Sequence, residues 1–472
     1  MAVRALRVVN LIPASLSGES GQDSEPNLAV DPQNPQRMVA TAFTRDPLGG
    51  PQAPVFLSSD GGRTWQVRSI VPGGSSTADI SVGFGDTGGT LFAGILRRDN
   101  VHLNVLRAAN PFTTTTMTVL LDRASEDQPW VTGGTVGGRD RVFIGHNDFN
   151  VGPRSASVVS SLDARTAAAP AGLVTRQVER RTTAGQNGPP VRTAVHPDGT
   201  AYAAFQRWTS ASSSSAGTDV TMDIVVVRGD PAAAVIGSYA DLTAADGLAG
   251  TAVAAGRFVR FTSSTGPLGQ ERIGADLSIA VDATDSDVVY VAWCDRVGGA
   301  AGTDWTMHVR RSLDRGHTWS ADLRTVTNAK NPALAVNARG HAGLLLQQLT
   351  GTGAAARWTT RLEVTRNGWA TTDLNAVLHT ALAAAPPRAF LPYLGDYVRL
   401  LSVGNDFYGV FSGSNLPAPA NFPSGVRYQR NADFTSQRLL AVDGITPVAV
   451  SIDPFFVHYA EPDNLPWAPS LL

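Results

Sequence analysis

The sequence predicts an all-β protein built from one repeated unit, and three observations lead to this prediction. The composition, with 43% hydrophobic residues, 17% charged residues and 47 glycines among 472, suits strands joined by tight turns and differs from that of disordered chains. A pattern of strand, polar turn and apolar strand recurs along the whole chain. The apolar residues of these repeats do not follow the 3.6-residue period of helices.

The repeated unit is clearest in residues 25–43 and 277–293, where an apolar strand ends in Val, a polar turn follows and a second apolar strand begins. In all the copies, the residues aligned before the turn are Val30, Val82, Val136, Val195, Val281, Val336 and Val403. Their spacings are 52, 54, 59, 86, 55 and 67 residues. Units of this length hold four antiparallel strands, so the sequence predicts a β-propeller of seven four-stranded blades, with six or eight as alternatives.

An eight-residue pattern, S-x-D-x-G-x-T-W, occurs at Ser58–Trp65 and again at Ser312–Trp319. In the first unit it falls between a predicted third strand, 54–58, and a fourth, 64–70, and the second copy has the same place in its own unit. The Asp can accept backbone hydrogen bonds, the Gly supplies a positive φ, and the Trp packs beneath the turn. We therefore assign a structural role to eight residues, Ser58, Asp60, Gly62, Trp65, Ser312, Asp314, Gly316 and Trp319. Residues 366–369 resemble a worn third copy.

The domain prediction is a single propeller spanning residues 1–472. Residues 209–260 lie in the longest step and are interpreted as a blade that carries insertions. An open first or last blade would expose strand edges, so a terminal strand should close the ring. Residues 1–20 and 445–472 are expected to supply this closure, with strand-like runs at 5–11, 448–452 and 455–459.

Charge and cysteine content exclude several classes of function. A formal net charge of −2 gives no broad positive surface for nucleic acid, and no apolar run is long enough for membrane insertion. The single cysteine, Cys294, excludes an internal disulfide. The eight histidines show no paired spacing for a metal, so neither a metal nor a cofactor is predicted. No signal peptide is recognisable at the N-terminus, which predicts a cytoplasmic protein or one exported by another route.

The two eight-residue copies resemble the Asp-box (BNR repeat) of sialidase-like β-propellers. The resemblance implies a glycan-directed protein and, if it is an enzyme, a glycoside hydrolase of exo-sialidase type. Sialidases use three arginines for the substrate carboxylate, an Asp as acid/base and a Tyr activated by a Glu. The Arg-Ile-Pro signature of that family is missing here, because Leu11-Ile12-Pro13 carries no Arg.

The candidate site residues therefore come from their places in the predicted blades, at the rim opposite the eight-residue turns. Tyr397 and Glu271 are the predicted nucleophile pair, and Asp148 is the third catalytic candidate. The predicted ligand-binding residues are Arg45, Arg97, Arg207, Arg296, Asp295 and Asp396. Such a rim can hold an acidic glycan by bidentate pairing and hydrogen bonds.

Two alternatives stay open at this point. Arg–Asp pairs at blade ends also tie neighbouring blades together, so any given pair can be structural. The chain can also be a non-catalytic propeller that docks a protein partner, as a scaffold or as cargo within a larger assembly.

Overall fold

The computed structural model describes residues 6–43, 52–85, 87–99, 101–168, 172–185, 191–214, 217–229, 239–261, 277–301, 304–384 and 394–462. These residues form seven four-stranded antiparallel sheets and one three-stranded sheet. Their helical segments are short 3-10 turns at Ala14–Leu16, Phe149–Val151, Gly299–Ala301, Gly353–Ala355 and Pro419–Asn421. None of these helices is long and apolar enough to cross a membrane. The all-β prediction is confirmed.

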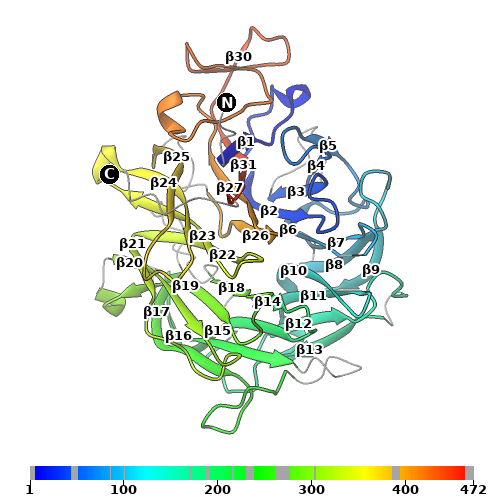
Figure 1. Cartoon of the computed structure of the whole chain (residues 1–472), viewed down its shortest axis with the longest axis vertical. Helices are drawn as coiled ribbons and strands as arrows, with labels where there is room; N and C mark the ends of the chain where they lie inside the picture. The colour runs from blue at the N-terminus through cyan, green and yellow to red at the C-terminus, as the bar shows by residue number, and fades with distance from the viewer. Residues whose placement is uncertain are drawn as a thin grey trace.

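The seven four-stranded sheets lie around a common centre, with the first strand of each nearest to it (Figure 1). The first strands are β2 (Ser24–Val30), β6 (Thr77–Phe84), β10 (Glu126–Val136), β14 (Val191–Val195), β18 (Leu277–Val281), β22 (Ala329–Val336) and β26 (Arg399–Val403). The second strands are β3 (Met38–Phe43), β7 (Leu91–Arg97), β11 (Arg139–Asp148), β15 (Ala201–Ser214), β19 (Val289–Val297), β23 (Ala342–Thr350) and β27 (Asp406–Ser414).

The outer strands complete each sheet. The third strands are β4 (Val55–Ser58), β8 (His102–Ala108), β12 (Ala156–Ser161), β16 (Gly217–Gly229), β20 (Asp304–Ser312), β24 (Arg357–Thr365) and β31 (Ile452–Tyr459). The fourth strands are β5 (Gln66–Arg68), β9 (Thr118–Arg123), β13 (Val174–Gln177), β17 (Thr251–Phe261), β21 (Arg324–Thr327), β25 (Leu374–Leu382) and β1 (Leu6–Asn10). Both chain ends thus enter the last sheet, where one terminal strand was expected to suffice.

The sequence repeat locates the first strands well. Val30, Val136, Val195, Val281, Val336 and Val403 are each the last residue of a first strand. Val82 differs, because β6 continues to Phe84 before its hairpin. Within the range 209–260, residues 209–214 and 217–229 extend β15 and β16 into a long hairpin that stays paired as far as Ser214 and Gly217.

Neighbouring first strands contact one another in chain order, and β26 contacts β2. Polar side chains link several of these neighbours by accepting a hydrogen bond from the backbone of the next strand. Asn27 accepts from Val82 N at 3.2 Å, Ser81 from Val131 N at 2.9 Å and Ser278 from Leu334 N at 2.9 Å. Apolar side chains fill the space between successive sheets, so the core is divided among the units.

A small sheet of β28 (Ala432–Asp433), β29 (Arg438–Leu440) and β30 (Pro447–Val448) is inserted before β31 and projects from the body of the molecule (Figure 1). The sequence analysis did not predict it. Its strands contain only two or three residues each, too few for a recognisable alternation of apolar residues.

Candidate functional site

The two eight-residue turns have the same internal hydrogen bonds. Ser58 Oγ accepts from Gly62 N at 2.9 Å, and Asp60 accepts from the backbone and hydroxyl of Thr64. In the second turn, Ser312, Asp314 and Thr318 repeat these contacts. Burial alone would raise the pKa of Asp314, but hydrogen bonds from Thr318 and Ser312 outweigh it and lower that pKa to about 2. The polar groups of both turns are therefore engaged in holding the turns.

The worn third copy forms the same turn with different residues. Thr365 takes the place of the Ser and accepts from Trp369 N at 2.9 Å, while Asn367 takes the place of the Asp and accepts from Thr371 N at 2.9 Å. Trp369 adopts a φ of 64° at the position where the other turns have Gly. The turn geometry thus extends beyond the S-x-D-x-G-x-T-W pattern.

All three turns lie at the rim where the first strands end. Gly61 N donates to Gln36 O at 3.0 Å, and Arg315 N donates to Asp287 O at 3.0 Å. Gln36 and Asp287 belong to the loops between first and second strands, so these loops and the eight-residue turns share one rim. We call it the turn rim.

The predicted arginines of the opposite rim are held by local partners. Arg97 donates to Asn104, Ser75 O and Pro72 O. Arg207 forms an ion pair with Asp223 at 3.1 Å, and Arg296 lies over the ring of Trp305 at 4.7 Å. Arg97, Arg207 and Arg296 thus each have a partner within their own sheet, and Arg45 lies outside the described residues.

The predicted carboxylates also have local partners. Asp148 pairs with Arg123 and accepts from Asn150 N at 2.9 Å. Asp295 accepts from Trp293 Nε1 at 2.9 Å and lies 3.2 Å from His308 Nε2. Glu271 lies outside the described residues, so the predicted nucleophile pair is described only at Tyr397.

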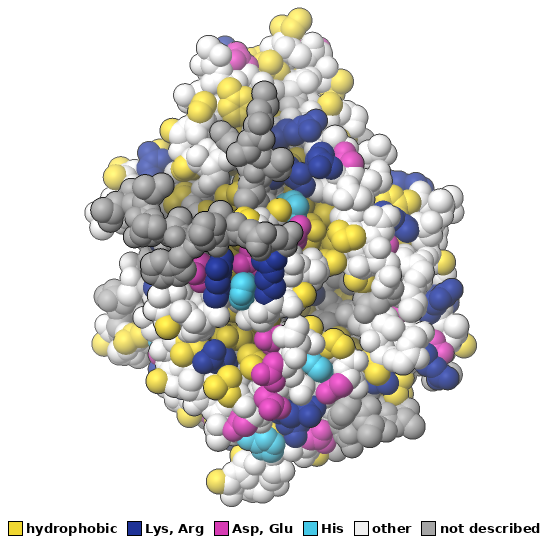
Figure 2. Space-filling model, viewed as in Figure 1, with side chains coloured by type: hydrophobic (Ala, Val, Ile, Leu, Met, Phe, Trp, Pro, Cys, Tyr) yellow, Lys and Arg dark blue, Asp and Glu magenta, His cyan; other side chains and the backbone are white. Residues whose placement is uncertain are grey.

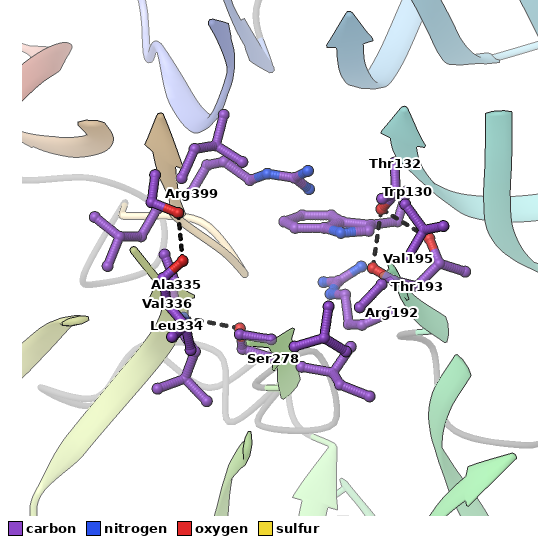
Figure 3. A pocket seen from close by; sticks show the side chains of 18 of the residues that line it. Trp130, Thr132, Arg192, Thr193, Val195, Ser278, Leu334, Ala335, Val336 and Arg399 are labelled. Carbon is purple, nitrogen blue, oxygen red and sulfur yellow. Dashed lines mark hydrogen bonds between the residues drawn. The ribbon is translucent and has the colours of Figure 1, made fainter. Parts of the chain in front are cut away.

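Three residues that the sequence analysis did not single out meet at the centre of the molecule. The Cζ atom of Arg192 lies 3.9 Å from the ring centroid of Trp130, and that of Arg399 lies 4.4 Å from the same centroid. Figure 3 shows the two guanidinium groups on opposite sides of the indole. Arg192 Nε donates to Leu277 O at 3.2 Å, and Arg399 Nη2 donates to Val131 O at 3.1 Å. We call Arg192, Trp130 and Arg399 the central stack.

Tyr397 lies beside the central stack, just before β26 begins. Its ring packs edge-on against Trp130 with 5.5 Å between centroids, and Arg192 Cζ lies 5.5 Å from the Tyr397 centroid. The Tyr397 hydroxyl is buried and has no hydrogen-bond partner among the described residues. Burial, helped by the charges of Asp79 and Glu25, raises the pKa of Tyr397 well above its ordinary value, whereas Arg192 acts in the opposite direction.

The carboxylates near Tyr397 come from separate sheets. Glu25 precedes Pro26 in β2, Asp79 lies in β6, and Asp396 is the neighbour of Tyr397. Glu25 Oε1 accepts from Asp396 N at 3.1 Å. Of the predicted set, Tyr397 and Asp396 are thus brought together. Their described neighbours are Glu25, Asp79 and Arg192 rather than the predicted arginines.

Three first strands contain the same irregularity near this centre. Glu25, Gln128 and Asn331 each precede a proline and have φ values of 51°, 55° and 54°. The strand register shifts at each of these places. Non-glycine residues with positive φ store strain, which concentrates at functional sites.

A cavity lies on the other side of the central stack, toward the turn rim. Its volume is about 190 Å³, and an adjoining cavity of about 160 Å³ shares Arg399, Thr132 and Ser402 with it. Val195, Val281 and Val336, at the ends of their strands, line the first cavity, and neither Tyr397 nor its neighbouring carboxylates line either one. These cavities thus lie toward the turn rim, whereas the site was predicted at the opposite rim.

One group of acidic residues outside the centre is close enough to share a metal ion. Glu19, Asp23 and Asp453 place one oxygen each within 4.8 Å of the others. Arg430 already pairs with Asp453 at 2.9 Å and lies 3.8 Å from Glu19. Burial, followed by repulsion from Asp453, raises the pKa of Glu19 to about 7. We interpret this group as a buried charge network that holds the chain termini.

Comparisons with known proteins yield only distant likenesses. No family model matches the chain, and no curated protein matches it. Among solved structures, a GH74 enzyme of Niastella koreensis has 11% identity and a TM-score of 0.40, covering 84% of this chain and 64% of its own. A PL25 ulvan lyase has 11% identity and a TM-score of 0.47, covering 84% and 92%. The GH93 α-L-arabinofuranosidase of Fusarium graminearum has 10% identity and a TM-score of 0.38, covering 94% and 97%.

All three TM-scores lie below 0.5, so these structures do not indicate the function of this chain. Figure 2 shows charged side chains of both signs in small groups on one face rather than one broad field of a single sign. The centre concentrates buried charged side chains from separate sheets, which makes it the strongest candidate for a functional site in the described structure.

Proposed function

We propose that the chain is a closed seven-bladed β-propeller that recognises and cleaves an acidic glycan at Tyr397. Support for the closed ring comes from the contact between β26 and β2 and from the sheet that both termini complete. The Asp-box kinship that the repeated turns suggest fits the same architecture. Architecture alone does not define chemistry, so the function depends on the centre.

The observation that carries this proposal is the setting of the Tyr397 hydroxyl. It is buried without a described partner, beside Arg192 and near three carboxylates. A tyrosine with a high pKa attacks only when a base takes its proton as the bond forms. Glu25 is suited to this role because its other oxygen is fixed by Asp396 N.

The proposed reaction has two steps. The Tyr397 oxygen attacks the anomeric carbon while its proton passes to Glu25, and the leaving oxygen receives a proton from Asp79 or Asp396. Water then attacks the anomeric carbon and gives its proton to the carboxylate that served as the acid. The bond to the Tyr397 oxygen breaks, and Glu25 returns its proton to that oxygen. Arg192 binds the acidic group of the sugar, because a guanidinium pairs with a carboxylate through two parallel hydrogen bonds.

The direct test is turnover of fluorogenic sialosides and uronides. Replacing Tyr397→Phe removes the attacking oxygen, so turnover should fall at least about 100-fold. Tyr239→Phe is a matched control, since Tyr239 is also buried with an unpartnered hydroxyl among the described residues but packs between the β10–β13 and β14–β17 sheets. Equal turnover by the two variants would contradict the proposal.

The alternative function, a protein-interaction scaffold, is favoured by one observation. The projecting small sheet exposes Val442 at 62% and Ile445 at 79%. Two apolar side chains at the end of a projection are suited to docking on a partner, although single exposed apolar residues are common. Loss of a purified partner's binding in Ile445→Ser, with glycoside turnover absent from the wild type, would favour the scaffold.

A further inference from the structure

The cavity beneath the central stack has an unusual charge. Two arginines, Arg192 and Arg399, line it, and no carboxylate is among the described residues of its lining. The adjoining cavity is also lined by Arg399, again with no carboxylate from the part of the chain that the structure describes. Buried cations are ordinarily paired, because an isolated charge loses its hydration without compensation.

Arg399 is the less compensated of the two arginines. Its residue is only 7% exposed, its Nη1 atom has no hydrogen-bond partner, and no ion pair joins it to a carboxylate in the described part of the chain. Burial, followed by repulsion from Arg192, lowers the pKa of Arg399 to about 9. The group therefore stays charged at neutral pH, and its partners among the described residues are Val131 O and the Trp130 ring.

The cavity also offers a neutral donor. Ser278 lines it and accepts a hydrogen bond from Leu334 N, which leaves the hydroxyl proton available. Ser402 Oγ donates to Val336 O, and Thr132 Oγ1 to Thr193 O, so those protons are engaged. Aliphatic side chains such as Leu334 and Val336 form the remaining wall. At about 190 Å³ the space is below the roughly 300 Å³ at which drug-sized pockets begin.

We propose that this cavity binds one oxyanion, a carboxylate or a sulfate group, with Arg399 Nη1 as its charged donor and Ser278 Oγ as its neutral donor. A charged donor in a partly dry cavity forms short, strong hydrogen bonds to such a group. The site is distinct from the proposed reaction centre, because Tyr397 does not line it. It does not require that the protein cleave a glycan.

The anion can be a free ion or the acidic group of a saccharide that enters from the turn rim. Both sources share the same chemistry at Arg399. The experiment therefore uses two probes, inorganic sulfate and a sulfated monosaccharide, each titrated into the full chain at constant ionic strength. Tighter binding of the saccharide would assign the anion to a glycan, and equal binding would assign it to a free ion.

Calorimetric titration and thermal unfolding should both report the site. Arg399→Met removes the charged donor, so we expect binding at least about tenfold weaker and no oxyanion-specific rise in Tm. Ser278→Ala should weaken binding a few-fold while leaving the fold intact. Sulfate stabilises many proteins by exclusion from their surface, so each result is compared with a control variant.

Arg181→Met is the matched control. Arg181 is equally buried, at 7% exposure, but it donates to Asp246, Ala249 O and Gly250 O outside the cavity. This variant and Tyr397→Phe should keep the oxyanion response. An unchanged response in both Arg399→Met and Ser278→Ala would overturn the proposal, and so would an absence of saturable binding of either probe to the wild type.

Discussion

The eight-residue turns at the rim and the residues at the centre differ in how their polar groups are hydrogen-bonded. In the turns, Ser58 and Asp60 use their oxygens in several hydrogen bonds within eight residues. At the centre, the Tyr397 hydroxyl and Arg399 Nη1 are buried without partners among the described residues. Unsatisfied buried groups cost stability, so the difference supports the proposal that the centre binds a ligand, whereas the turns serve the fold.

The largest expected effect is on the fold, at Gly62. This residue has a φ of 77°, and a Cβ there would lie 2.3 Å from the ring of buried Phe456. Gly62→Ala should therefore lower the free energy of unfolding by roughly 3–4 kcal/mol, from backbone strain together with overpacking. Gly137→Ala is the control, because Gly137 has a φ of 58° with open space around it and should cost only about 1 kcal/mol. Denaturant unfolding of both variants measures the difference, and similar losses would show that the packing against Phe456 is loose.

A second effect on the fold depends on pH. Burial lowers the pKa of His379 from 6.5 to about 4, so the folded state favours the neutral ring. Its stabilising contribution is complete above pH 6.5 and is lost as the pH falls toward 4, by up to about 3 kcal/mol. Unfolding free energies across this range should be flatter with pH in His379→Gln than in the wild type. Parallel curves would contradict the assignment.

A smaller effect should distinguish the turns from one another. Ser58→Ala and Ser312→Ala each remove an acceptor for a backbone N–H, and each should cost about 1–2 kcal/mol. Thr365→Ala should cost about as much, because Thr365 accepts from Trp369 N in the same way. Denaturant midpoints test this equivalence. If Thr365→Ala were neutral, the third turn would be held by other contacts.

Many of the strands and turns can be predicted from the sequence, because they depend on residues that are close together in the chain. The valines before each turn fix the ends of six first strands, and the turn hydrogen bonds follow from Ser, Asp, Gly and Thr at fixed spacing. The equivalence of Thr365 and Asn367 to Ser and Asp could also have been found, since each offers the same acceptor. The last sheet contains a strand from each chain end, β1 and β31. This is harder to predict, because from the sequence either end alone could complete the sheet.

The centre could not be predicted in the same way, because its residues come from separate sheets. Trp130, Arg192 and Arg399 are each about 60 or more residues apart, and only the arrangement of the sheets brings them together. One signal was present, since Arg192 and Arg399 are the charged residues inside or at the start of first strands that are otherwise uncharged. The predicted arginines were instead selected for their position at the rim. That position does not reveal whether a side chain already has a local hydrogen-bond or ion-pair partner.

The contrast between residues that stabilise the fold and residues of the candidate site at the centre can be tested by comparing two equally buried arginines. Arg181 is paired with Asp246 and several carbonyls, whereas Arg399 has an unpartnered Nη1 within the described structure. In denaturant unfolding, Arg181→Met should lower the free energy of unfolding by roughly 3 kcal/mol, because Glu179 would lose its compensating charge. Arg399→Met should instead raise the free energy of unfolding by about 1 kcal/mol, because it removes a buried charge that has no described ion-pair partner. If Arg399→Met lost as much stability as Arg181→Met, Arg399 would be a residue that stabilises the fold, and a ligand site at the centre would be contradicted.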